Sequence, residues 1–307
     1  MRIAVVGAGG VGGGFGAALA HAGADVTFIA RGAHLAAMKS QGLKIESPRG
    51  NTHLVPTRAT DDPATVGPVD VVLFCVKLWD VESAGSHIKP IIGRDTAVIP
   101  LQNGIDAAER LIPLLGKAAV MGGVANISAT IAAPGTIRQT GTVQRIVFGE
   151  LDGKRTKRAE AFAELCGKAG VEGVLSEAIL TELWMKFILL ASNASIMALT
   201  RLPIGKLRDD PDIAPWFTTA YREVEAVGRA AGVALPADAV ERTLNFNRVA
   251  PPHLMASMAV DLLRGNRIEL PWLSGKVVEL GKKHGVPTPA HGLMYAALKP
   301  YVMGAPT

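Results

Sequence analysis

The sequence has few cysteines, few aromatic residues and no concentrated charge. Its two cysteines, Cys75 and Cys166, are too few for a disulfide framework or a cysteine metal cluster. No pair of histidines has metal-ligand spacing, and no run approaches the length of about 18 uncharged apolar residues that a membrane helix needs. The net charge of +5 is scattered along the chain without a basic tail. We therefore expect a cytoplasmic protein that binds no metal, no nucleic acid and no membrane, and whose charge suits a small anionic ligand.

Apolar residues and glycine are abundant. Hydrophobic residues make up 49% of the 307 residues, enough for two domains with a core each. There are 34 glycines, or about 11%, against a usual share of about 7%. The position of these glycines is therefore the first guide to function.

The hydrophobic pattern changes character along the chain. Residues 1–177 read as strands alternating with helices, which predicts a doubly wound parallel sheet with an antiparallel extension. The predicted strands of this parallel sheet are 2–6, 25–30, 70–76, 96–100 and 118–124. Residues 178–307 show helical periodicity alone. We expect an α/β chain: an N-terminal Rossmann-type dinucleotide-binding domain over 1–177, then an all-helical substrate domain over 178–307.

A glycine-rich turn follows the first predicted strand. Gly7-Ala8-Gly9-Gly10-Val11-Gly12 lies between a strand and a helix, the context in which GxGxxG binds a dinucleotide. Gly7 permits the tight turn, Gly9 lets the backbone approach a pyrophosphate, and Gly12 allows close helix–strand packing. The alternative is a glycine-rich loop without a ligand. The context favours a dinucleotide on the first helix N-terminus.

Arg31 follows the second predicted strand, where an NAD-binding protein usually has an acidic residue. A cation at this position suits a 2′-phosphate, so we expect NADP(H) rather than NAD. The alternative is a solvated surface arginine.

Polar residues follow two further strands, at the edge where ligands of doubly wound sheets bind. Lys77 comes directly after the strand at 70–76, and Gln102-Asn103-Gly104 follows the strand ending at Pro100. A solvated lysine and an ordinary turn are the alternatives, but the position favours roles beside the nicotinamide.

The helical half has one lysine inside an apolar helix, Lys186. Burial lowers the pKa of a lysine, which suits a group that gives up a proton near neutral pH. Asn193 lies two helical turns further on. The alternative is a lysine whose amine reaches the surface.

Ser257, Asp261 and Glu269 are further polar candidates. Asp261 lies one turn after Ser257, and Glu269 stands shortly before a proline. Both carboxylates could equally be surface partners of Arg264 and Arg267, and the sequence leaves this open.

Together these residues resemble the ketopantoate reductase (2-dehydropantoate 2-reductase) family along essentially the whole chain. The resemblance implies hydride transfer from NADPH to a small anionic 2-oxo acid, giving a 2-hydroxy acid, in a cleft between two domains. Ketopantoate itself would place the enzyme in pantothenate biosynthesis.

The resemblance also implies residue roles. Lys186 would be the general acid, Asn103 would hold substrate and nicotinamide, and Lys77 would line the catalytic site and contact the cofactor. Ser257 and Glu269 would bind the two ends of the substrate, with Glu269 part of the catalytic group.

Three positions depart from the family pattern, which has asparagines where this chain has Leu190, Ala194 and Ser274. Asn193 is a candidate replacement as substrate ligand, and the substrate could equally be another oxo acid or carbonyl compound. Two rival hypotheses are a β-hydroxyacid or opine-type dehydrogenase and an NADP sensor without turnover. The apolar helices leave room for a homodimer.

Overall fold

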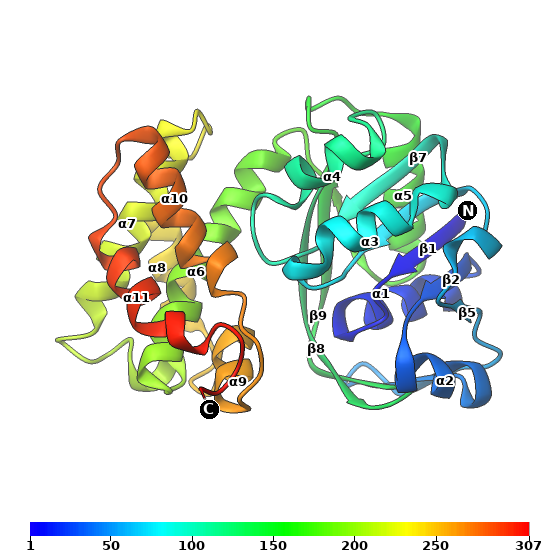
Figure 1. Ribbon diagram of the computed structural model, residues 1–307, viewed down its shortest axis with the longest axis horizontal. Helices are drawn as coiled ribbons and strands as arrows, with labels where there is room; N and C mark the ends of the chain where they lie inside the picture. The colour runs from blue at the N-terminus through cyan, green and yellow to red at the C-terminus, as the bar shows by residue number, and fades with distance from the viewer. Residues whose placement is uncertain (307) are drawn as a thin grey trace. The chain divides into compact units, whose positions relative to one another are not determined.

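The structure is a computed structural model that describes residues 1–306, and the chain folds into two compact units. Unit 1 contains Met1–Gln102 and Asp106–Ile179, and unit 2 contains Asn103–Ile105 and Leu180–Thr307. Unit 1 carries two sheets, whereas unit 2 is helical (Figure 1). This confirms the predicted fold class; separate cofactor and substrate roles for 1–177 and 178–307 stay a prediction.

The first sheet of unit 1 is parallel, with the strand order β5-β2-β1-β6-β7. Its strands are β1 (Arg2–Val6), β2 (Asp25–Ile29), β5 (Ala59–Thr60), β6 (Val69–Phe74) and β7 (Ile92–Pro100). The helices of unit 1 are α1 (Gly10–His21), α2 (Gly32–Gln41), α3 (Val81–His87), α4 (Ala107–Leu115) and α5 (Lys157–Lys168). Because the winding reverses beside β1, the carboxyl ends of β1 and β6 form the switch point at which doubly wound folds bind ligands.

The second sheet is a long hairpin with shorter strands on it. Its members are β3 (Leu43–Glu46), β4 (Thr52–Leu54), β8 (Gly122–Ala133), β9 (Thr136–Gly149) and β10 (Glu172–Leu175). The prediction of a parallel-sheet strand at 118–124 was wrong. Only Val120 bridges to Val98, and from Gly122 the chain pairs antiparallel with β9. The turn at Gly135, with φ +74°, lets the two strands pair along most of their length.

Unit 2 is built around the long helix α6 (Ile179–Thr200). Its other helices are α7 (Ala214–Ala230), α8 (Ala239–Val249), α9 (Ser257–Leu263), α10 (Ser274–His284) and α11 (Pro289–Leu298). By length and composition α6 could cross a membrane, but 61% of its most apolar window is buried inside the protein. Phe187, Ile188 and Ala191 are at most 1% exposed, so α6 is the core helix of this unit.

Candidate functional site

The turn between β1 and α1 has the geometry that its glycines predict. Gly7 has φ +90°, and a Cβ there would lie 2.9 Å from the backbone of Cys75 at the end of β6. A Cβ on Gly12 would lie 2.2 Å from the carbonyl oxygen of Gly7. Glycine is therefore required at both positions, because the backbones of the turn, α1 and β6 approach closely.

Gly9 is different, because space is open in front of it. It is the N-cap of α1 with an extended backbone, and a Cβ there would meet no atom within 4 Å. No side chain caps α1, and its first turn has no acidic residue. The first N–H groups of α1 lie at this end with the positive end of the helix dipole behind them, and the open space lies in front of Gly9. At Gly10 the backbone of Ala129 in β8 is close, since a Cβ there would lie 2.0 Å from its carbonyl oxygen. This arrangement fits an anionic phosphate group.

Arg31 follows β2 and caps α2. Its side chain is 77% exposed, and its Nη2 lies 3.2 Å from Oδ2 of Asp80, which comes shortly after β6. One exposed ion pair of this kind contributes little stability, so the guanidinium remains available to an incoming anion.

His34 was missed by the sequence analysis. The backbone N–H of Gly135 donates to its Nδ1 at 3.0 Å, so Nε2 carries the ring proton and donates to the Ala8 carbonyl at 2.9 Å. Burial lowers the pKa of His34, which keeps the ring neutral, although the bond to Ala8 opposes this. His34 thus holds the glycine turn through a contact that no local sequence pattern predicts.

Two side chains fasten the loops that follow β6 and β7. The buried Gln102 donates from Nε2 to the carbonyls of Phe74 and Val76, at 2.9 and 3.1 Å. Arg110 donates to the Leu78 carbonyl at 2.7 Å and forms a two-pronged ion pair with Glu82.

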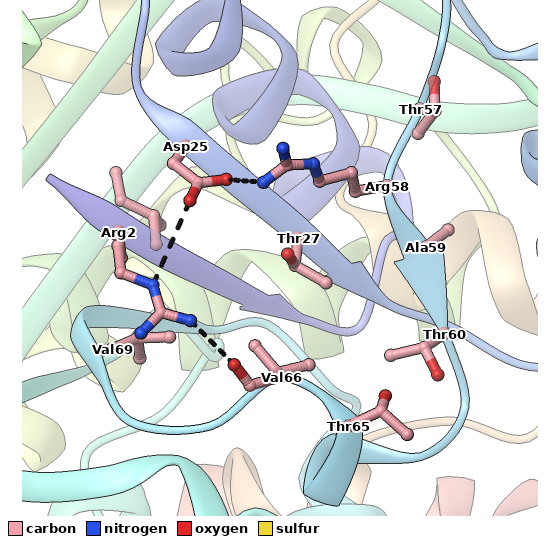
Figure 2. A pocket seen from close by; sticks show the side chains of 11 residues that line it. Arg2, Asp25, Thr27, Thr57, Arg58, Ala59, Thr60, Thr65, Val66 and Val69 are labelled. Atoms are coloured by element: carbon pink, nitrogen blue, oxygen red, sulfur yellow. Dashed lines mark hydrogen bonds and ion pairs between the residues drawn. The ribbon is translucent and has the colours of Figure 1, made fainter.

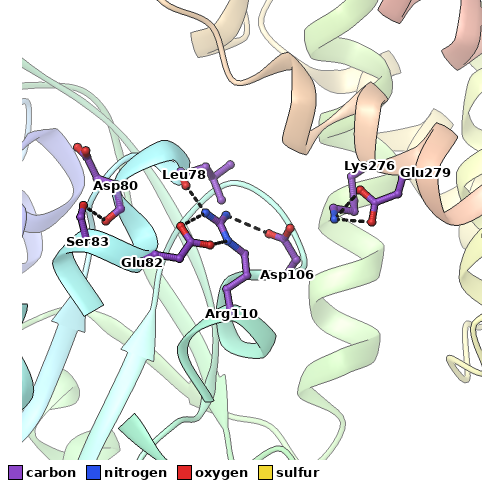
Figure 3. Close-up of polar contacts among 8 residues, drawn as sticks. All are labelled: Leu78, Asp80, Glu82, Ser83, Asp106, Arg110, Lys276 and Glu279. Atoms are coloured by element: carbon purple, nitrogen blue, oxygen red, sulfur yellow. Dashed lines mark hydrogen bonds and ion pairs between the residues drawn. The ribbon is translucent and has the colours of Figure 1, made fainter. Parts of the chain in front are cut away.

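The carboxylate of Asp106 lies 3.6 Å from Arg110, so this arginine joins the loop after β7 to the loop after β6 (Figure 3). Lys77 is exposed at the start of the loop after β6, and its amine lies 5.5 Å from the centre of the Trp79 ring. The backbone around Lys77 is thus fixed by the contacts of the loop.

In unit 2 the structure brings together Lys186, Asn103 and Glu269. The ammonium of Lys186 donates to Oδ1 of Asn103 at 3.1 Å. Burial lowers the pKa of Lys186 to about 8, and the nearby negative charge of Glu269 acts in the opposite direction. Glu269 is 5% exposed, which excludes the surface-carboxylate alternative. The group therefore holds a lysine that can give and take a proton near neutral pH.

Asn193 and Ser274 do not join this group. Asn193 accepts from the hydroxyl of Tyr221 and donates to Oδ1 of Asn247 at 2.8 Å, so both ends of its amide have partners. Ser274 is fully buried, 2.7 Å from the Ser195 hydroxyl, and also contacts a histidine of α11. We therefore leave both out of the proposed substrate set.

Ser257 is the first residue of α9 and is exposed.

Within residues 1–306 no group of three or more metal-binding side chains gathers.

Family models, sequence relatives and solved structures are all similar to this chain along most of its length. The family model "Ketopantoate reductase PanE/ApbA" matches residues 3–153, and the model of its C-terminal domain matches residues 178–302. The uncharacterized oxidoreductase YkpB of Bacillus subtilis is 31% identical, covering 98% of this chain and 99% of its own. The 2-dehydropantoate 2-reductase of Mesorhizobium japonicum is 30% identical, covering 97% of each chain. The crystal structure of a PanE/ApbA family ketopantoate reductase from Ralstonia eutropha superposes with a TM-score of 0.90 at 33% identity, covering 98% of each chain.

Proposed function

The chain belongs to the ketopantoate reductase family, oxidoreductases that act on CH–OH groups, and from this premise we propose that it reduces a 2-oxo acid to a 2-hydroxy acid with NADPH. The first candidate substrate is 2-dehydropantoate, which would place the enzyme in pantothenate biosynthesis. The observation that carries the proposal is Lys186, hydrogen-bonded to Asn103 and influenced by the charge of Glu269.

Lys186 acts as the general acid. Negative charge develops on the carbonyl oxygen of the substrate as the keto carbon is reduced, and an ammonium stabilises that charge and then donates its proton. Asn103 orients the ammonium from one side, and Glu269 favours its protonated form. A lysine with a pKa near 8 is protonated at neutral pH and still releases its proton readily.

Unit 1 holds the cofactor, which supplies the hydride when bound. Gly7 and Gly9 lie in the turn before α1, and Gly10, Val11 and Gly12 form the first turn of that helix. The open space in front of Gly9 and the uncapped N–H groups suit the pyrophosphate. Arg31 would bind the 2′-phosphate, and Lys77 and Asn103 would contact the nicotinamide half. These assignments rest on the fit of the donors to the charges of the cofactor.

A second candidate substrate is a bulkier or less polar 2-oxo acid. Leu190 lies one helical turn after Lys186 and is partly buried, Ala194 is fully buried, and Ser274 is engaged within the core. Leu190 therefore offers apolar surface, and the buried Ala194 and Ser274 offer no hydrogen bonds to a substrate. Ser257 and Glu269 remain the proposed polar ligands for its two ends.

The proposed function is tested by mixing the purified protein with NADPH and a series of 2-oxo acids of increasing side-chain size. Consumption of NADPH, followed by its absorbance, should occur with at least one of them. The value of kcat/KM across the series decides between 2-dehydropantoate and a bulkier acid. Absence of turnover with every 2-oxo acid would contradict the proposal.

Arg31→Ala is expected to weaken NADPH binding by about tenfold or more, because the loss of a charge-assisted bond to phosphate costs roughly 1.5–3 kcal/mol. NADH has no 2′-phosphate, so its affinity should change little. Fluorescence titration of both cofactors measures the difference, with the exposed Arg94→Ala as the charge-matched control. Equal weakening of both cofactors, or of neither, would remove the assignment of Arg31.

We also propose a cytoplasmic location. Both cysteines are free thiols, and burial raises the pKa of Cys166 to about 12 and that of Cys75 further still, so both stay protonated and unreactive. Chains that keep free thiols are typical of reducing compartments.

A further inference from the structure

Unit 2 contains a pocket between α7 and α8, away from the residues assigned above. Its volume is about 560 Å³, within the range of small-molecule sites. The guanidinium groups of Arg208, Arg222 and Arg248 line it, together with the apolar side chains of Phe217 and Leu244, and none of the lining residues is acidic.

The positive charge of this pocket is poorly neutralised. Arg222 has no hydrogen bond or ion pair within the described part of the chain, and Arg248 donates only to the neutral amide of Asn245, at 2.8 Å. Arg208 donates to backbone carbonyls, and its one carboxylate neighbour, Asp209 at 3.7 Å, is 82% exposed. Two of the three cations have no carboxylate partner and the third has only an exposed one, so they repel one another, and an anion would relieve that repulsion.

A cavity in unit 1 shows the contrast. It lies at the amino ends of the parallel strands and measures about 490 Å³. Figure 2 shows Asp25 between Arg2 and Arg58, with both arginines directed toward its carboxylate. The cations of that cavity are therefore already paired, and those of the unit 2 pocket are not.

The walls of the unit 2 pocket are fixed before any ligand binds. Asn247, which lines it, is 4% exposed and is held by the hydroxyl of Tyr221 and by Asn193 of α6. Arg208 is held by the carbonyls of Asn247 and Ala250, at 2.8 and 2.5 Å. A preformed site loses little conformational freedom on binding, which favours affinity.

We propose that this pocket binds a small organic molecule in which a phosphate-type dianion is joined to an apolar body. Guanidinium groups match the geometry and charge of such a dianion, and two of the three have no charged partner to give up. The side chains of Phe217 and Leu244 offer contact to the apolar body. The site is separate from Lys186 and from the glycine turn, so its occupancy does not depend on the function proposed above.

The test is calorimetric titration of the full-length protein with phenyl phosphate, with inorganic phosphate as the probe that lacks the apolar body. Excess NADPH is present, because the N-terminus of α1 also attracts phosphate. Phenyl phosphate should bind at least about tenfold more tightly than inorganic phosphate, since only it buries apolar surface. Arg222→Ala and Arg248→Ala should each weaken phenyl phosphate by about tenfold or more.

Arg242→Ala is the matched control. Arg242 lies on the same helix as Arg248, is ion-paired with Asp238 at 2.9 Å and does not line the pocket, so its removal changes the net charge equally. Its affinity for phenyl phosphate should stay within about twofold of the parent value, as for a distant and independent site.

Four results would overturn the proposal. They are no measurable binding of phenyl phosphate, equal affinity for inorganic phosphate, equal weakening in the control, and a change of molecular mass in the Arg222 and Arg248 variants by light scattering. The second would mean an adventitious ion only, the third a diffuse surface charge, and the fourth an interface between two copies of the chain.

Discussion

Replacement of Lys186 by alanine should lower kcat by about 10²–10⁴-fold, the range that a positioned general acid contributes. The ammonium is the group that meets the charge developing on the carbonyl oxygen, and the amide of Asn103 cannot donate a proton in its place. Cofactor affinity should be retained, because the proposed phosphate contacts come from the glycine turn and Arg31. Steady-state kinetics with NADPH, beside direct cofactor titration, separates the two effects.

Two further variants test whether the loss of kcat comes from the missing proton donor. Lys186→Arg keeps a positive charge but replaces a group with a pKa of about 8 by one that stays protonated. Its kcat should therefore remain far below the parent value. Lys282→Ala removes an exposed lysine of α10 and should leave kcat unchanged. An unaltered kcat in Lys186→Ala would refute the general-acid role.

The same role fixes the pH dependence of kcat/KM. A general acid acts in its protonated form, so kcat/KM should be full below the pKa of Lys186 and fall as the pH rises through about 8. Glu269 raises that pKa, and Glu269→Gln should therefore move the alkaline limb to lower pH. A limb that stays in place or moves to higher pH would show that Glu269 does not act on Lys186.

The parts of the fold that were predicted correctly depend on local patterns. The sequence around Gly7, with a strand before it and a helix after it, gives the first βαβ unit, and apolar periodicity gives the helices of unit 2. The strand expected at 118–124 was misplaced, because an apolar run predicts a strand but not its partner. The pairing of Gly122 with Gly149 is decided by a long hairpin, which involves residues far apart in the sequence.

The candidate site likewise contains residues that local patterns predict and residues that act through contacts distant in the sequence. Lys186 and Asn103 were predicted by residue type and position, and the structure joins them at 3.1 Å. His34 contacts Ala8 across 26 residues and Arg110 contacts Leu78 across 32, and no spacing rule reveals such contacts. Asn193 is a different case: its helical spacing from Lys186 suggested a substrate ligand, and in the structure both ends of its amide are hydrogen-bonded to buried side chains of neighbouring helices.

The second large effect is expected at Gly9, where a change of charge separates cofactor binding from folding. Gly9→Asp should weaken NADPH about 1000-fold more than Gly9→Asn, because a carboxylate about 4 Å from a phosphate is repelled by roughly 4 kcal/mol at an effective dielectric constant near 20. The two side chains have nearly the same size and both accept hydrogen bonds from the first N–H groups of α1. The difference between them therefore isolates the charge of the phosphates from steric obstruction of the site.

The stability of the cofactor-free protein, in contrast, should not fall in Gly9→Asp. A Cβ at Gly9 meets no atom within 4 Å, and the residue already has the extended backbone of an N-cap. Aspartate is a better N-cap than glycine by a few tenths of a kcal/mol and also complements the helix dipole, so the free energy of unfolding should be unchanged or slightly raised. Urea denaturation of the cofactor-free protein measures this, beside fluorescence titration with NADPH. Equal NADPH affinity in Gly9→Asp and Gly9→Asn would mean that no phosphate binds in front of α1, because a carboxylate at this position would repel any phosphate bound there.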